Sequence, residues 1–203
     1  MEKNLDKDYF LWQSFKDGGD DAFYRLYDQY ADALYRYGLH FSKDKEFIKD
    51  CIQDLFLDLY KYRTKLSTTD NIRYYLLRSL RRKIHHEIDK VKPIEYYNYQ
   101  SENETGIMTF EELIIASDTE EENMRLLRNA MKKLTDHQRE GLSLKFEHNL
   151  SYLEISEILE MSVESARTSI YRALKILRKS IQDEQSSIQL LFFLSKCSSL
   201  SVR

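Results

Sequence analysis

The chain has 203 residues, a formal net charge of -3 and a hydrophobic content of 42%. This length suits one large domain or two small ones, and the apolar content is enough to build buried cores, which excludes a disordered chain. Only five glycines and one proline occur, and apolar residues recur at helical spacing through most of the chain, so we predict an all-α protein.

Cysteine usage and hydropathy indicate the compartment. The two cysteines, Cys51 and Cys197, have no metal-ligand spacing. The sequence shows neither a signal peptide nor an apolar run of about 18 residues. We therefore expect a protein of the reducing cytoplasm that does not insert into a membrane and needs no metal or other cofactor.

Residues 1–92 are expected to form a helical bundle. Gly18 and Gly19 end a short first helix, because glycine is common just after a helix end. Three longer helices follow, each with an apolar stripe at steps of three and four residues. The stripe of the second helix contains Phe23, Leu26, Tyr27, Tyr30, Leu34, Tyr37 and Phe41. That of the third contains Phe47, Ile48, Cys51, Ile52, Leu55 and Leu59. After a polar loop over 64–70, the stripe of the fourth contains Ile72, Tyr75, Leu76, Leu80, Ile84 and Ile88.

The third and fourth helices carry exposed faces of opposite character. The third presents an acidic and amide-bearing patch, which suits a basic protein partner or is simply solvated. Its members are Asp50, Gln53, Asp54 and Asp58. The fourth gives the bundle a basic edge able to contact phosphates. Its members are Arg73, Arg78, Arg81, Arg82 and Lys83.

An acidic segment with weak periodicity, residues 93–122, is typical of a linker. It separates the bundle from a second helical domain at 123–183, which an apolar tail at 184–203 follows. The tail is too short to span a bilayer. Either it folds back over its own domain, or it docks to an inhibitor or across the two lobes.

Residues 151–179 are predicted to form a helix-turn-helix. Ser151 with Glu154 makes a capping box, as Thr135 does with Gln138 upstream, and Ser162 caps the second helix of the motif. One face of that second helix is apolar and must be buried, and it contains Ala166, Ile170, Leu174, Leu177 and Ile181. The remaining arc can reach the major groove and the phosphates of DNA, or is a solvated basic surface. It contains Arg167, Thr168, Tyr171, Arg172, Lys175, Arg178 and Lys179.

These parts together resemble a known family. The segments that carry the resemblance are Asp50-Cys51-Ile52-Gln53-Asp54-Leu55-Phe56, Tyr152 to Leu159, Ser165-Ala166-Arg167 and Arg172-Ala173. Their order and spacing, from about Asp20 to Ile181, resemble the extracytoplasmic-function (ECF) sigma factors of the sigma-70 family, with regions 2 and 4 present. The resemblance implies a bacterial alternative sigma factor, which is a DNA-binding initiation subunit of RNA polymerase and not an enzyme.

The resemblance also implies roles for particular residues. Those that match core-polymerase-binding positions are Asp50, Gln53, Asp54, Phe56 and Asp58. Those that match the segment that opens and reads the -10 element are Asn71, Arg73, Tyr74, Tyr75, Arg78, Arg81, Arg82 and Lys83. We expect at most one of the two tyrosines to contact an unstacked base. Those that match the reader of the -35 element are Ser165, Arg167, Thr168, Ser169, Tyr171, Arg172 and Lys175, with Arg167 the best candidate for base readout.

The partners implied by the resemblance are core RNA polymerase, promoter DNA and an anti-sigma factor, with the free protein a monomer. Four positions depart from the family pattern: Glu160 replaces the usual Gly of the turn, Ser169 a common Arg, Arg82 a common Asn and Ala166 a usual Val. Two other functions stay open on the residues alone. A stand-alone repressor or activator would dimerise and bind half-sites about 34 Å apart. A protein-interaction adaptor would leave both basic surfaces solvated.

Overall fold

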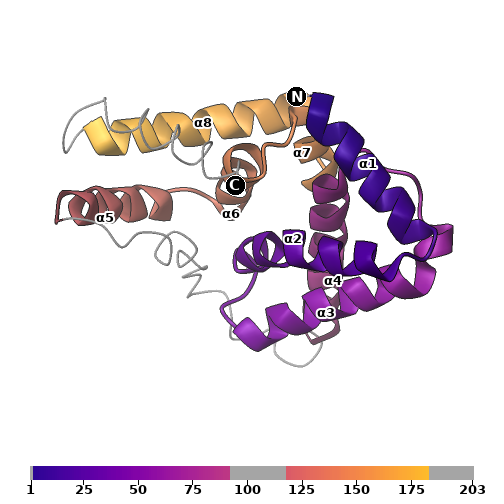
Figure 1. The fold of residues 1–203 in the computed structure, drawn as a ribbon. Helices are drawn as coiled ribbons and strands as arrows, with labels where there is room; N and C mark the ends of the chain where they lie inside the picture. Colours follow the sequence, from indigo (N-terminus) through magenta and orange to yellow (C-terminus); the bar gives the residue numbers. More distant parts are fainter. Residues whose placement is uncertain (1, 92–117, 183–203) are drawn as a thin grey trace. The chain divides into compact units, whose positions relative to one another are not determined.

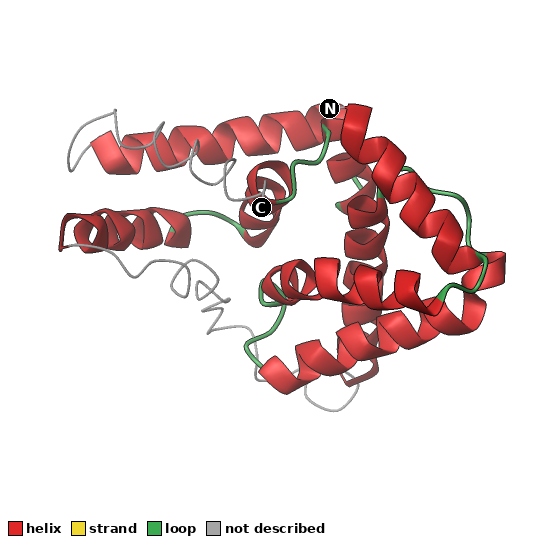
Figure 2. Ribbon diagram, viewed as in Figure 1, coloured by secondary structure: helices red, strands yellow, loops and turns green. Residues whose placement is uncertain are grey.

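The computed structural model describes residues 2–91 and 118–182. Within these ranges the chain is helical and contains no strand, so the all-α prediction is confirmed (Figure 2). The chain divides into two compact units, Met1–Gly106 and Ile107–Arg203. The apolar tail at 184–203 and most of the predicted linker lie outside the described residues.

The first unit is a bundle around α2 (Figure 1). Its elements in chain order are α1 (Glu2–Lys16), α2 (Asp20–Gly38), α3 (Lys45–Tyr62), the short 3-10 helix η1 (Arg63–Lys65) and α4 (Ile72–Val91). Helix α2 packs against α1, α3 and α4, while α3 and α1 also contact α4. The loop at residues 66–71 joins η1 to α4.

Local signals set the ends of these helices. Gly18 follows α1 with φ of +93°, a conformation that favours glycine, as the sequence predicted. Asp44 caps α3, since its carboxylate accepts hydrogen bonds from the backbone N–H groups of Glu46 (3.0 Å) and Phe47 (3.1 Å). Asn71 caps α4 in the same way by accepting from the N–H of Tyr74 at 3.0 Å.

The predicted stripes form much of the core of this unit, but not all of their members are buried. Half-buried members are Phe23, Phe41, Phe47, Tyr75 and Ile88, and Phe41 lies beyond the end of α2 at Gly38. Tyr27 is 49% exposed and so lies at the edge of the core, although it was expected inside. Helix α1 contributes Trp12 and Phe15, which are 0% and 1% exposed and were not singled out from the sequence. The other large side chains below 2% exposure in this unit are Leu26, Leu34, Tyr37, Ile48, Ile72, Leu76, Leu77, Leu80 and Ile84.

The second unit is built around the last helix. Its elements are α5 (Asp118–Lys132), α6 (Asp136–Leu142), the π-helical segment η3 (Ser143–Glu147), α7 (Tyr152–Ile158) and α8 (Val163–Gln182). Helix α8 packs against α5, α6 and α7. Because α5 begins at Asp118, residues 118–122, which were expected to belong to the linker, are helical. An acidic run at a helix start is favoured by the helix dipole, and in sequence it is hard to tell from a linker.

Most of the predicted apolar face of α8 is buried, and the side chain of its last member, Ile181, lies outside the described residues. Ala166, Ile170 and Leu177 are at most 4% exposed, and Ala173 joins them at 0%. Leu174 is only half-buried, because the spacing 166, 170, 173, 177 places it beside the stripe. Leu144, Leu150 and Ile155 belong to the same core, at no more than 1% exposure.

The contact between the end of α2 and α3 yields a first prediction. A Cβ added at Gly38 would lie 2.5 Å from Cγ2 of Ile48, so Gly38→Ala forces two packed helices apart. We expect this change to lower the free energy of unfolding by about 1 to 3 kcal/mol, measured by chemical denaturation. In an Ile48→Ala background the clash is absent, so adding Gly38→Ala there should cost almost nothing. An equal loss in both backgrounds would contradict the packing described.

Candidate protein and nucleic-acid interfaces

The outer face of α3 gathers the predicted acidic patch. Asp50, Gln53, Asp54 and Asp58 are all exposed, at spacings of three and four residues that place them on one side of the helix. Leu57 lies among them and is 57% exposed. Leu57 was not among the predicted contact residues, and its only signal in the sequence is that it is an apolar residue outside the buried stripe. We call these five residues the α3 face.

Phe56, which the resemblance placed among the partner-binding residues, is not part of this surface. It is 3% exposed, and its ring centroid lies 4.9 Å from that of Tyr27 and 6.1 Å from that of Phe23. Phe56 therefore supports α3 from beneath, because the same helical spacing that exposes Leu57 turns its neighbour towards α2. We correct its expected role to one of packing.

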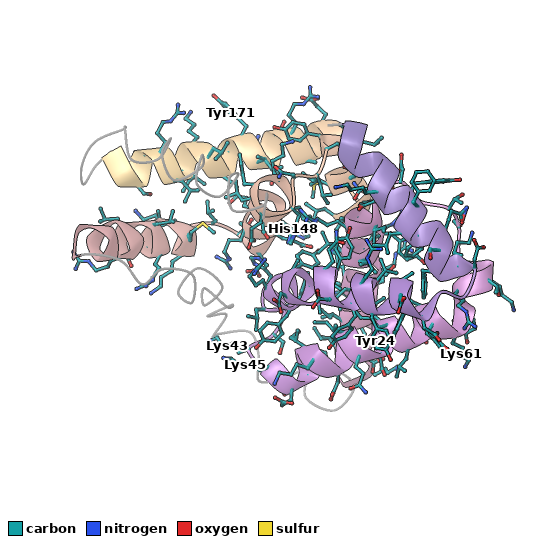
Figure 3. The ribbon with its side chains drawn as sticks, viewed as in Figure 1. Tyr24, Lys43, Lys45, Lys61, His148 and Tyr171 are labelled. Atoms are coloured by element: carbon teal, nitrogen blue, oxygen red, sulfur yellow. The ribbon has the colours of Figure 1, made fainter. Side chains whose placement is uncertain are left out.

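Aromatic side chains border the α3 face on the side of α2. Tyr24 is 70% exposed, Tyr27 49% and Tyr60 42% (Tyr24 is labelled in Figure 3). The half-buried Phe23 holds two of them by ring contacts, at 6.3 Å from Tyr24 and 5.2 Å from Tyr60, while Tyr27 packs on Phe56. An acidic strip beside exposed rings and a leucine is a surface suited to a partner helix with basic and apolar residues.

An ion pair links the α3 face to α4. Nζ of Lys83 lies 2.7 Å from the carboxylate of Asp58, and the two side chains are 19% and 55% exposed. The resemblance had placed these two residues on different partners, one on protein and the other on DNA. In this structure each neutralises the other, so Lys83 presents less positive charge to a phosphate than the sequence suggested.

The remaining predicted residues of α4 divide by burial. Arg82 is exposed, whereas Arg73, Arg78 and Arg81 are half-buried. Asn71 stands at the start of the helix, where its side-chain oxygen is used as the cap of α4. The basic edge is therefore formed mainly by side chains whose aliphatic parts lie against the bundle.

The two tyrosines of α4 have different surroundings. The Tyr75 ring packs on Trp12, with centroids 5.0 Å apart, and burial raises the pKa of its hydroxyl. The Tyr74 hydroxyl instead accepts a hydrogen bond from Nη1 of Arg78 at 2.6 Å, and the guanidinium lies 5.8 Å from the ring centroid. Tyr74 and Arg78 thus form one unit with an aromatic face and a positive charge, which can stack on a base and contact its phosphate.

The helix-turn-helix is present and its caps are as predicted. The hydroxyl of Ser151 accepts from the N–H of Glu154 at 3.2 Å, and the Glu154 carboxylate accepts from the N–H of Ser151 at 2.7 Å. Ser162 accepts from the N–H of Ser165 at 3.1 Å and so caps α8. The box of Thr135 and Gln138 is also formed.

Glu160 in the turn has φ of +56°, in the left-handed region that favours glycine. Glu160 stands where the family usually has Gly, and it accepts the strain of this conformation with its side chain exposed.

The outer face of α8 presents most of the predicted DNA-reading residues. Ser165, Arg167, Tyr171, Arg172 and Lys175 are exposed, and Thr168 and Ser169 are half-buried. Tyr171 reaches 67% exposure and points outward from the helix (Figure 3). Arg178 and Lys179 continue the exposed basic surface.

Arg167 is oriented by Tyr152, which was not among the predicted DNA-reading residues. Its guanidinium lies 5.3 Å from the ring centroid of Tyr152 in α7 and 3.8 Å from the Glu164 carboxylate. Nζ of Lys145 lies 4.7 Å from the same ring. Tyr152 therefore holds two cations near the start of the recognition helix, each through a cation–π contact.

Comparisons with known proteins match both units. The family model described as sigma-70 region 2 matches residues 26–92, and that described as sigma-70, region 4 matches residues 124–177. The ECF RNA polymerase sigma factor SigW of Bacillus subtilis is 25% identical over 174 residues, covering 83% of this chain and 93% of the relative. SigM of the same organism is 25% identical over 165 residues, covering 78% of this chain and 97% of the relative.

Two solved structures share the fold. One is CnrH in complex with the cytosolic domain of CnrY, with a TM-score of 0.58 and 17% sequence identity. The match covers 88% of this chain and 99% of the CnrH chain. The other is the sigma factor RpoE of Bartonella quintana in complex with the anti-sigma factor NepR, with a TM-score of 0.59 and 16% sequence identity. The match covers 80% of this chain and 98% of the RpoE chain. Within the residues described, no helix is both long and apolar enough to cross a membrane.

The strained turn yields a second prediction. Glu160→Gly should raise the free energy of unfolding by about 0.5 to 1 kcal/mol, since the relief of left-handed strain exceeds the added chain entropy. Thermal and urea unfolding of the full chain measure this. As a control, Glu157→Gly within α7 should lower stability by about 1 kcal/mol. Destabilisation by both changes would contradict the positive φ at residue 160.

Proposed function

Because this chain belongs to the sigma-70 family, as an ECF sigma factor, we propose that it binds core RNA polymerase and directs transcription initiation at promoters with its own -35 and -10 elements. The observation that carries this proposal is the occurrence of region 2 and region 4 in order on the two compact units. A stand-alone repressor or activator would need only the second. The function is one of binding, in a family of initiation factors and not of catalysts.

The α3 face is the proposed contact with core polymerase. Its carboxylates attract a basic partner surface, and Leu57 with the neighbouring tyrosines supplies the apolar area that an interface needs at its centre. The family match to region 2 includes all of α3. The proposed partner surface, implied by the resemblance, is the clamp helices of the polymerase's largest subunit. Asp50, Gln53, Asp54 and Asp58 are the polar members of this contact.

Helix α4 is the proposed reader of the -10 element. The Tyr74 and Arg78 unit offers a ring to an unstacked base, worth about 1 to 3 kcal/mol per stacked base, next to a guanidinium for the phosphate. Arg81 and Arg82 extend the phosphate contacts along the strand. Tyr75 serves as the wall behind this site, since one side of its ring is covered by Trp12.

Helix α8 is the proposed reader of the -35 element. Arg167 lies in its first turns, where side chains of a recognition helix reach base edges in the major groove. Tyr152 keeps the guanidinium in a narrow range of directions before DNA arrives, which lowers the entropy lost on binding. Arg172, Lys175 and Arg178 set the orientation through phosphates.

A protein inhibitor is the proposed regulator. In the structure of RpoE that shares this fold, the sigma factor is in complex with an anti-sigma factor. The α3 face and the basic surface of α8 have opposite charge, so a segment that covers one of them must differ in composition from a segment that covers the other. We propose that an anti-sigma factor occludes at least the α3 face, which would prevent polymerase binding directly.

The docking proposal is tested with Gln53→Ala and Asp54→Arg together. We expect binding to purified core polymerase to fall at least about tenfold and run-off transcription to fall with it, because the α3 face then carries a positive charge towards a basic partner. Asp32→Arg on the exposed side of α2 makes the same charge change outside the face and serves as the control. Unchanged polymerase binding by the double variant would refute the proposed surface.

The -35 proposal is tested by comparing Arg167→Ala with Arg178→Ala in the polymerase holoenzyme. Loss of a base contact should cost about 1 to 3 kcal/mol at one base pair of the -35 element and relax selectivity there. Loss of a phosphate contact should weaken all promoters alike and reduce the slope of log affinity against log salt by about one. If Arg167→Ala weakens all promoters alike and reduces the salt slope, the proposal that Arg167 reads a base is wrong.

A further inference from the structure

A hydrogen bond from the Trp12 indole joins the N-terminal helix to the loop at residues 66–71. Trp12 of α1 is 0% exposed, and its Nε1–H donates a hydrogen bond to the backbone carbonyl of Ser67 at 2.8 Å. Ser67 and its neighbour Thr68 are exposed. A fully buried side chain thus fixes the backbone of an exposed loop, and α1 precedes the residues matched to region 2.

The same helix also holds the chain just after the loop. The Asp8 carboxylate accepts a hydrogen bond from the Tyr30 hydroxyl at 3.1 Å and another from the backbone N–H of Ile72. Helix α1 therefore contacts the backbone on both sides of Asn71, at Ser67 and at Ile72. Between these two anchors the loop is short, so its path is set largely by α1.

Trp12 also braces the first turn of α4. Its ring lies 5.0 Å from the ring of Tyr75, whose neighbour Tyr74 is the proposed base-stacking residue. A shift of the indole would therefore change both the loop and the wall of the proposed -10 site. Sites of this kind discriminate between bases only when their backbone is held in one arrangement.

We propose that Trp12 is a positioning residue that sets the base selectivity of the -10 site by holding the Ser67 carbonyl and the Tyr75 ring. This proposal rests on the function proposed above. Trp12 does not touch DNA; it acts through the loop and Tyr75. When the indole N–H is lost, the Ser67 carbonyl can bond to water because it lies in an exposed loop, so the loop is loosened while the fold persists.

Substitution separates positioning from stability. Trp12→Phe keeps an aromatic ring against Tyr75 and removes the donor, and Tyr9→Phe removes a polar group from an exposed position of the same helix as a control. Holoenzymes carrying each variant are assayed by run-off transcription on promoters with single changes in the -10 or the -35 element. For Trp12→Phe we expect core binding and -35 selectivity to be kept and the discrimination between -10 variants to fall about fivefold.

The outcomes of this assay are distinct. Unchanged discrimination between -10 variants would overturn the proposal. An equal loss of selectivity at both elements would also overturn it, because a general loss of stability lowers transcription from all promoters alike. No transcription from any promoter by the unsubstituted chain would instead refute the proposed function.

A second measurement needs no substitution. The chain has one tryptophan, so 5-fluorotryptophan gives a single ¹⁹F resonance from Trp12 when the labelled chain is joined to unlabelled core polymerase. A single-stranded oligonucleotide with the -10 sequence should shift this resonance, and a -35 duplex should not. An unmoved resonance at saturating -10 DNA, under conditions that support transcription, would overturn the proposal.

Discussion

The direction of every candidate contact residue depends on one constraint, the complete burial of an apolar stripe along each helix. On α8 the side chains of Ala166, Ile170 and Leu177 are at most 4% exposed. Rotation of the helix by one residue, about 100°, would expose them and bury charges instead, which is far costlier than any single surface contact. The core therefore fixes which side chains face outward, and the contact surfaces follow from it.

Within that constraint, tyrosine rings determine how the cations are held. Lys145 and Arg167 lie against Tyr152, Arg78 against Tyr74, and the Arg63 guanidinium lies 4.6 Å from the ring of Tyr60. A ring that is half in the core and half exposed cannot move far, so it restricts a long side chain that would otherwise sample many rotamers. This explains part of the high tyrosine content, 15 residues, in a chain whose net charge is negative. Selective binding then comes from the placement of the positive charges, and not from an excess of them.

What the sequence could predict was local. Capping at Ser151 and Thr135, the buried stripes and the exposed α3 carboxylates all follow from spacing along one helix, and the structure contains them. Contacts between elements were not predictable in this way. The bond from Trp12 to Ser67 spans 55 residues, and the pair of Lys83 with Asp58 spans 25, so no periodic pattern signals them. The burial of Phe56 and the partial exposure of Leu174 depend on which neighbouring helix covers the edge of a stripe, which periodicity alone leaves undecided.

The two proposed contacts, of the α3 face with polymerase and of the outer face of α8 with promoter DNA, can be tested in one experiment. A photo-crosslinking amino acid placed at Leu57 or at Tyr171, which are 57% and 67% exposed, reports the neighbour of each face directly in the promoter complex. We expect Leu57 to crosslink to the largest subunit of the polymerase and Tyr171 to DNA at the -35 element. Crosslinks from Leu57 to DNA, or none from Tyr171 in a complex that initiates transcription, would refute these contacts.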